Sequence, residues 1–259
     1  MGKAIKKSDN ALIKKRRKKR FIKRIILLFT FLISMLVMLC LKHPLFNISN
    51  IKTEHNNIVS SDELINLSGI YKGNNIFYIN TSKSIKGILK NPYILNVKVE
   101  RKLPNTIIIS VEERDAVYYG KKDNSFLVID KTGIVLEEKA DIKNMKLIEL
   151  IGFDYSKAEV GKKISAADSR QLDFIESLVG VLKNDKKFMD GITSVDASDL
   201  YSFKIYYGNI CIKLGGPEDL DKKLNTAVNI MDRDEFKQAV KGGYIDVGYD
   251  GNPVYFIEK

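Results

Sequence analysis

Residues 130–133 read Asp-Lys-Thr-Gly, which matches the start of the phosphorylation motif of P-type ATPases. In that motif the aspartate is a nucleophile that takes up a phosphoryl group. Here Ile134 stands where the motif has threonine, and no large ATPase domain accompanies it in a chain of 259 residues. Because aspartate and glycine are common turn residues, we interpret these letters as a turn between two short apolar strands.

Two further groups of acidic residues resemble catalytic sites. Asp232, Arg233 and Asp234 resemble the acid-x-acid metal site of Golgi glycosyltransferases. They end a predicted helix, where a charged face meets solvent, and the chain has no nucleotide-binding repeat of strands and helices. Glu112 and Glu113 are consecutive in a predicted strand, so their side chains point to opposite faces and do not form a facing pair. Neither group supports catalysis.

The other reactive residue types are scarce. The chain contains two histidines, His43 and His55, and two cysteines, Cys40 and Cys211, without metal-ligand spacing. It has no nucleophile elbow, no HExxH pattern and no glycine-rich phosphate loop. Cys40 lies in an apolar segment, so Cys211 has no partner for an intramolecular disulfide in the remainder. We therefore predict no catalytic residue, no metal and no cofactor, and a protein that is not an enzyme.

The apolar segment runs from Ile25 to Leu41. Its seventeen residues reach ~25 Å as a helix, so flanking residues such as a snorkelling Lys42 complete the span of a ~30 Å hydrocarbon core. Twelve lysines and arginines and one acid, Asp9, precede it. Basic flanks stay cytoplasmic, so we predict a cytoplasmic tail over residues 1–24, a transmembrane helix over residues 25–42 and extracytoplasmic domains beyond.

This segment is expected to remain attached to the chain. No small-x-small cleavage pattern follows it, and Leu39 stands where a small residue would precede a lipidated Cys40. The tail's twelve basic residues minus one acid give +11, the net charge of the whole chain, so the rest of the sequence is balanced. A basic run beside a span is typical of a topology signal and of contact with anionic lipids, so we expect membrane lipids and no nucleic acid among the partners.

Residues 46–114 are predicted to form a first exported domain. A strand opens at Ile51 and includes His55, and Ser60 caps a helix that Gly69 ends. A second helix is predicted from about Thr81 to Leu89. Alternation then predicts a hairpin whose buried positions are Val97, Val99, Ile107, Ile109 and Val111. The order is strand, helix, helix, strand, strand.

Residues 115–259 are predicted to form a second, mixed α/β domain with antiparallel hairpins, which makes the exported part α+β. Short strands are expected at residues 117–119, 126–129 and 134–136, and a closing pair at residues 244–247 and 254–257. Two helices are expected. The first is capped by Ser165 with Asp168 and buries Leu172, Ile175, Leu178, Val179 and Leu182. The second, over residues 218–231, buries Leu220, Leu224, Val228 and Met231.

A hairpin around Gly208 and Asn209 allows its register to be derived. With a two-residue turn, the pairs on one face are Tyr207 with Ile210, Ile205 with Ile212 and Phe203 with Leu214. The pairs on the other face are Lys204 with Lys213 and Tyr206 with Cys211. Because two lysines face each other, we expect the second face to be solvated and Cys211 to be near the surface and available to maleimide.

A dense, ordered set of residues runs through both domains. In the first it comprises Gly73, Asn75, Ile76, Phe77, Pro92, Tyr93, Val99, Arg101, Leu103, Pro104, Thr106, Ile107, Ile109, Val111, Glu113 and Arg114. In the second it comprises Asp130, Gly133, Ile134, Val135, Ile245, Asp246, Tyr249, Gly251 and Val254. This set resembles the FtsQ/DivIB family of bacterial cell division proteins, whose first exported domain is a POTRA domain. With the basic tail and single span, the resemblance covers essentially the whole chain.

The resemblance implies a non-catalytic bitopic scaffold of the division complex at the septum. Proteins of this family use the late strands of the second domain to hold bitopic division proteins of the FtsB/DivIC and FtsL types, and so serve septal peptidoglycan synthesis indirectly. Small α+β modules bind partners by adding a strand to an open edge. Two edges are candidates, one in the POTRA sheet and one at the last strand. The resemblance favours the last strand, so we predict partner contacts at Val254, Tyr255, Phe256 and Ile257. The alternative is an ordinary closing strand with its aromatic residues in the core.

Two other functions remain open at this point. A POTRA-bearing protein also fits envelope assembly in secretion or sporulation. A type II membrane glycosyltransferase fits the topology and the Asn-x-Ser sequons at Asn47, Asn66 and Asn80. The location of the protein separates the three interpretations. A division protein gathers at the septum, a sporulation protein gathers at the engulfing membrane, and a Golgi transferase is not found in bacteria.

Overall fold

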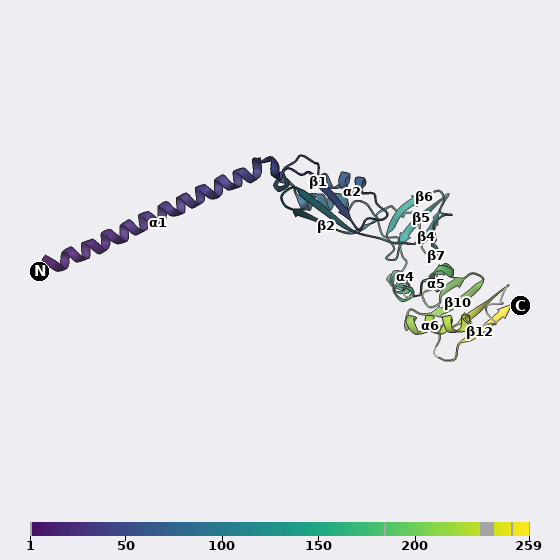
Figure 1. Ribbon diagram of the computed structural model, residues 1–259. Coiled ribbons are helices and arrows are strands. Elements are labelled where there is room, and N and C mark those ends of the chain that lie inside the picture. The colour runs from purple at the N-terminus through teal and green to yellow at the C-terminus, as the bar shows by residue number, and fades with distance from the viewer. Residues whose placement is uncertain (1, 184, 234–240, 250, 259) are drawn as a thin grey trace. The chain divides into compact units, whose positions relative to one another are not determined.

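The computed structural model describes residues 2–183, 185–233, 241–249 and 251–258. The chain divides into two compact units, which are Met1–Ile88 with Val97–Val111, and Leu89–Asn96 with Glu112–Lys259. Figure 1 shows the elements of both units in chain order. Asp234, from the acid-x-acid triplet, lies outside the described residues.

Helix α1, Gly2–Lys42, is the long purple helix of Figure 1. Its large apolar side chains between Ile25 and Leu39 are 48–71% exposed. A helix with apolar side chains around its whole circumference is stable where lipid covers it. The stretch Lys14–Lys42 is long and apolar enough to cross a membrane, in agreement with the predicted span.

The rest of the first unit is a small α+β fold. After α1 come η1 (Pro44–Phe46), β1 (Asn50–Glu54), α2 (Ser61–Ser68), η2 (Ile76–Tyr78), α3 (Thr81–Ile88), β2 (Ile94–Lys102) and β3 (Thr106–Glu113). The strand order is β1-β3-β2, with β1 parallel to β3. The predicted order of strand, helix, helix, strand, strand is confirmed. The buried apolar side chains include Ile48, Leu64, Ile70, Ile76, Ile88, Ile107 and Ile109.

Local signals explain the ends of the first exported helix. The Ser60 hydroxyl accepts a hydrogen bond from the Glu63 amide at 3.2 Å, as predicted, and Gly69 ends α2 with a left-handed φ of 63°. One prediction was wrong, because His55 follows β1 rather than lying in it and has a φ of 63°. Helix α3 agrees with its predicted limits to within one residue, and Leu89, just beyond its end, is 44% exposed.

The second unit is built on a nine-stranded sheet, in the order β12-β11-β10-β9-β8-β7-β4-β5-β6. Its strands are β4 (Ala116–Lys122), β5 (Ser125–Asp130), β6 (Val135–Lys139), β7 (Ile148–Ile151), β8 (Ile192–Asp196), β9 (Phe203–Tyr207), β10 (Ile210–Gly215), β11 (Gly242–Asp246) and β12 (Val254–Glu258). Its helices are α4 (Ser169–Leu182), α5 (Lys186–Gly191) and α6 (Leu220–Met231). The sequence patterns did not reveal β7, β8 or α5. The strands β7 and β8 join the β4–β6 meander to the β9–β10 hairpin through parallel pairing of β4 with β7 and of β7 with β8.

One hydrophobic core lies between this sheet and its helices. The Phe174 ring of α4 stacks on the Phe203 ring of β9 with their centroids 4.1 Å apart. The predicted cap of α4 was partly wrong, because Asp168 and Gln171 form the capping box and Ser165 instead makes a β-bridge with Asp154. Buried Gln171 also donates to the Gly152 and Ala197 carbonyls, which joins α4 to two loops.

The register of the β9–β10 hairpin is confirmed except at its open end. Tyr207 pairs with Ile210, Ile205 with Ile212 and Lys204 with Lys213, as derived. A bulge after Lys213 shifts the next pair, so Phe203 faces Gly215 rather than Leu214.

Helix α6 presents a different stripe from the one predicted. Its buried side chains are Leu220, Leu224, Ala227 and Ile230. Val228 and Met231, which were expected in the core, are partly buried at its margin. The prediction placed the next buried residue after Leu224 four positions on, at Val228. In the structure the next buried residues are instead three and six positions on, at Ala227 and Ile230.

Asp130 is a structural residue. Its carboxylate is 2% exposed, accepts from the Thr132 and Ile134 amides at 2.8 Å each, and receives the Arg114 guanidinium at 2.7 Å. Gly133 has a φ of 86°, which suits the turn. These bonds explain the Asp-Lys-Thr-Gly letters without phosphorylation chemistry.

Replacing Asp130 with alanine should therefore destabilise the second unit strongly. The Asp130→Ala variant loses the turn bonds and leaves a partly buried Arg114 without its anion, which costs on the order of 3 kcal/mol. Glu100→Ala is the control, because the Lys98–Glu100 pair is exposed and is worth less than ~1 kcal/mol. Urea unfolding of the detergent-solubilised chain measures both, and equal effects would contradict this role.

Candidate functional site

The predicted partner-binding residues form β12, the strand at one end of the nine-stranded sheet. It pairs antiparallel with β11, with Tyr244 opposite Phe256 and Asp246 opposite Val254. The predicted closing pair of strands is confirmed. In the described chain the other side of β12 has no neighbouring strand, so the segment is an edge.

The aromatic side chains of β12 lie outside the core. Tyr255 is 37% exposed and Phe256 is 54% exposed. Successive side chains of a strand point to opposite faces, so these two flank the edge on both sides. The structure thus favours an exposed aromatic edge over a closing strand with core aromatics.

Each aromatic ring is held by a neighbour. On one face Phe256 stacks with Tyr244 at a centroid distance of 6.0 Å, and the Lys213 ammonium lies 4.4 Å from the Tyr244 ring centre. On the other face Tyr255 lies opposite the buried Ile245, and the Arg233 guanidinium is 5.7 Å from its ring centre. These contacts restrict the orientation of both rings.

The Phe256 side of the edge continues across the sheet as a row of half-buried side chains. The strand registers place Phe256, Tyr244, Cys211 and Tyr206 side by side on four neighbouring strands. Lys204 and Lys213 form the next row of the same face on β9 and β10. We call these six residues the open face. The core and the helices lie behind the alternate residues, such as Ile205, Ile212 and Ile245.

The sequence predicted only part of the open face. The Tyr206–Cys211 and Lys204–Lys213 pairs followed from the hairpin, but Tyr244 was missed as a member. Its place depends on the parallel pairing of β10 with β11, which joins segments separated by α6. Long-range pairing of this kind has no local sequence signal.

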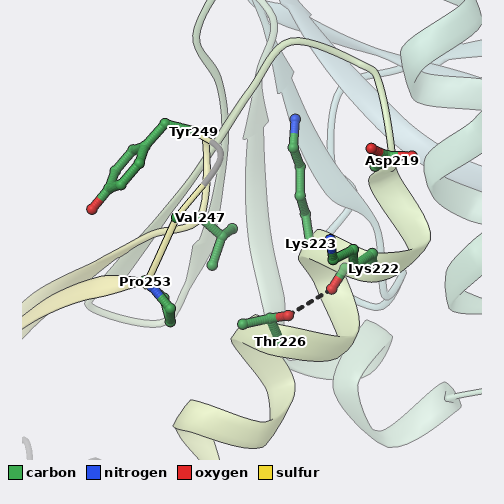
Figure 2. Close-up of a pocket in the computed structure, with 8 residues that line it drawn as sticks. Asp219, Lys222, Lys223, Thr226, Val247, Tyr249 and Pro253 are labelled. Carbon is green, nitrogen blue, oxygen red and sulfur yellow. Dashed lines mark hydrogen bonds between the residues drawn. The ribbon is translucent and has the colours of Figure 1, made fainter.

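The described part of the second unit has two pockets. One of about 320 Å³ lies between α5, the β9–β10 hairpin and the end of α6, and is lined mainly by Phe188, Tyr207, Ile210, Val228 and Met231. Figure 2 shows the other pocket, beside the β11–β12 connection, where α6 contributes Lys222, Lys223 and Thr226 and the connection contributes Tyr249. Its volume is about 80 Å³, far below the ~300 Å³ of a small ligand site. The Thr226 hydroxyl donates to the Lys222 carbonyl at 2.8 Å, an ordinary helix contact. Across the described residues no group of three or more His, Cys, Asp or Glu side chains is arranged to hold a metal.

Comparison with known proteins accounts for both units. Residues 46–114 match the family described as POTRA domain, FtsQ-type, and residues 117–247 match Cell division protein FtsQ/DivIB, C-terminal. The chain belongs to the FtsQ/DivIB family. Members of this family are non-catalytic cell division proteins, so the chain is a division protein rather than an enzyme. This assignment replaces the two alternative functions, a membrane glycosyltransferase and an envelope-assembly protein.

The individual relatives are also cell division proteins. The chain is 46% identical over 252 residues to Cell division protein DivIB of Clostridium botulinum (strain Hall), covering 97% of this chain and 98% of that protein. It is 44% identical over 253 residues to DivIB of Clostridium acetobutylicum, covering 98% and 100%. DivIB of Bacillus subtilis is 32% identical over 126 residues, 48% of each chain. The C-terminal family match ends at residue 247, before β12, so the edge strand itself lies beyond the matched region.

Cys211 lies on the open face, so the reactivity of its thiol is a measure of how accessible that face is. Its side chain is half-buried, and burial raises the pKa of the thiol, against the lowering effect of the Tyr206 hydroxyl and of Lys204 and Lys213. The thiol is thus less accessible than the sequence indicated, although it lies on the solvated face as expected. Tyr206 beside it also has a raised pKa, with burial as the main cause.

Maleimide labelling of a Cys40→Ser chain should therefore be slower for folded Cys211 than for the same thiol in denaturant. The thiolate is the reactive form, so the raised pKa lowers the rate near neutral pH, and the folded rate keeps rising above ~pH 8.5, where an unfolded thiol levels off. The denatured chain is the control. Equal rates in the folded and denatured states would contradict the half-buried position.

Proposed function

We propose that this protein is a single-span scaffold of the division complex, whose β12 edge binds the exported segments of bitopic division proteins of the FtsB/DivIC and FtsL types at the septum. Through them it serves septal peptidoglycan synthesis indirectly. The observation that carries the proposal is an exposed edge strand with aromatic side chains on both of its faces. The family membership supplies the division role.

Binding at this edge is strand addition. A partner strand pairs with the outer backbone groups of β12 and aligns its side chains with Val254 and Phe256 on one face and with Tyr255 and Ile257 on the other. Backbone pairing supplies affinity, while the side chains select the sequence of the partner. Because Tyr255 and Phe256 are large and prearranged, they are the expected anchors.

A strand alone buries less than the ~1,000 Å² of a stable interface. The open face beside β12 offers the additional area. Phe256, Tyr244 and Tyr206 form an aromatic row there, and the next row places Lys204 and Lys213 between Asp196 and Asp246, so its charges are mixed. A partner helix with an apolar face bordered by charges of both signs fits this surface, since the aromatic row and the mixed charged row are then both matched.

The proposed topology places residues 1–24 in the cytoplasm and both exported units outside. The basic residues that precede the span support this orientation, because lysine and arginine near a span are retained on the cytoplasmic side. All of the proposed partner contacts then lie in the same compartment as the exported parts of bitopic partners. The domain limits proposed are residues 46–114 for the POTRA domain and 115–259 for the second domain.

Replacing both aromatic residues of β12 should weaken partner binding. The Tyr255→Ala/Phe256→Ala chain is expected to lose roughly tenfold or more in affinity for the exported segment of a DivIC-type partner, because two anchors are truncated. Isothermal titration calorimetry on the detergent-solubilised chain measures it. Tyr201→Ala is the matched control, since Tyr201 is 78% exposed in the same unit but lies outside β12. Unchanged affinity in a folded double variant would remove β12 from the site.

A fluorescent protein fused to the N-terminus should gather at the mid-cell septum of dividing bacteria. The expected pattern follows from recruitment into the division complex, and fluorescence microscopy through one division cycle measures it. The same fluorescent protein on an unrelated single-span helix is the control and should label the whole membrane evenly. An even signal from the full chain as well would count against the division role at the septum.

A further inference from the structure

Asn75 joins the end of the membrane helix to the first exported sheet unit. Its side chain is 7% exposed, and its Nδ2 donates to the Cys40 carbonyl at 3.0 Å and to the Leu41 carbonyl at 3.1 Å. Its Oδ1 accepts from the Phe77 amide at 2.9 Å. The last carbonyls of a helix have no partner within the helix, so Asn75 satisfies two of them while it caps η2.

The backbone around η2 is fixed from several directions. Arg101 of β2 donates through its guanidinium to the Ile76 carbonyl at 2.9 Å and to the Ile79 carbonyl at 2.5 Å. The Ile48 amide donates to the Asn74 carbonyl at 2.9 Å. The turn that carries Phe77 and Tyr78 is therefore bound to β2 on one side and to the chain leaving the membrane helix on the other.

This fixed turn presents apolar side chains to its surroundings. Phe77 is 38% exposed, Tyr78 is 68% exposed, and Leu45 of η1 is 53% exposed. The Phe77 ring lies 5.3 Å from the ring of Phe46, which is four residues beyond Lys42, where α1 ends. We call Leu45, Phe77 and Tyr78 the collar. It lies beside the end of the membrane span. Asn75 and Arg101 hold the η2 backbone that carries Phe77 and Tyr78, and the Leu45 amide donates to the His43 ring at 3.1 Å.

We propose that the collar inserts into the headgroup region of the outer membrane leaflet, so that the POTRA unit is seated on the lipid surface rather than held away from it on a flexible connector. Lipid is the occupant because the collar is continuous with the span, which already contacts lipid. Tyrosine and phenylalanine suit this depth, where an apolar ring body meets hydrocarbon and a hydroxyl meets water. This inference goes beyond the scaffold function and does not depend on it.

The chain contains no tryptophan, so one introduced tryptophan reports its own position. A full-length Tyr78→Trp chain in phosphatidylcholine and phosphatidylglycerol vesicles should lose about half of its emission when lipids brominated near the headgroup end of the acyl chains replace the ordinary ones. It should also be shielded from acrylamide. Phe31→Trp, inside the span, gives the fully quenched reference, and Tyr201→Trp, in the second unit, should respond to acrylamide alone.

Emission from Tyr78→Trp that is unaffected by brominated lipid and as open to acrylamide as that from Tyr201→Trp would overturn the proposal. In that case the collar would be a contact surface for a protein partner, which the lipid vesicles do not contain. Septal localisation of the fusion protein is measured separately, so failure here does not bear on the division role.

The Asn75 contact has its own matched pair of variants. Asn75→Ala removes the bonds to the Cys40 and Leu41 carbonyls together with the cap of η2, whereas Asn80→Ala removes the cap that Asn80 gives to the Lys83 amide and touches no carbonyl of α1. In the Tyr78→Trp background, Asn75→Ala should lower the quenching by brominated lipid and Asn80→Ala should preserve it. Equal quenching in both would overturn the seating role of Asn75.

Discussion

The unpaired side of an edge strand is the constraint on which the second unit depends. Alternate backbone N–H and C=O groups of β12 point away from β11, and such groups require either water or another strand. Natural sheets commonly blunt such edges with lysine, proline or a bulge. Here Pro253 precedes the strand, and within Val254–Glu258 the charged residue is Glu258 near its end. The centre of the edge is apolar and regular, which suits strand addition rather than protection.

The single core of this unit then determines which surfaces remain for binding. Helices α4 and α6 bury the side chains that alternate with the open face, so the period of two along β9, β10 and β11 assigns Tyr206, Cys211 and Tyr244 to the uncovered side. The core needs only one face of the sheet in this region. The edge and the open face therefore share a boundary at Phe256, and both lie within reach of the proposed partner.

Much of this architecture was predictable because its signals are local. Caps at Ser60 and Asp168, the turn at Gly133 and the β9–β10 register all depend on neighbouring residues, and the FtsQ/DivIB resemblance was confirmed. The last strand was predicted as one of two candidate edges, and β12 does lie at the end of its sheet. The parallel pairs of β7 and β8 and the placement of Tyr244 were not, because those contacts join distant segments. The bulge that moves Phe203 to Gly215 lies at the open end of the hairpin, away from the turn residues from which the register was derived.

Membrane attachment explains why a modest edge is sufficient for the proposed scaffold. A partner strand at β12 and a helix on the open face form an interface of limited area, which in free solution gives limited affinity. When both proteins are anchored in the same bilayer, the second contact becomes nearly intramolecular and its effective concentration rises sharply. A fixed joint between α1 and η2 adds to this effect for the first unit, because Asn75 restricts the positions that the exported chain samples above the membrane. Weak contacts that are individually reversible are then sufficient for the scaffold that we propose.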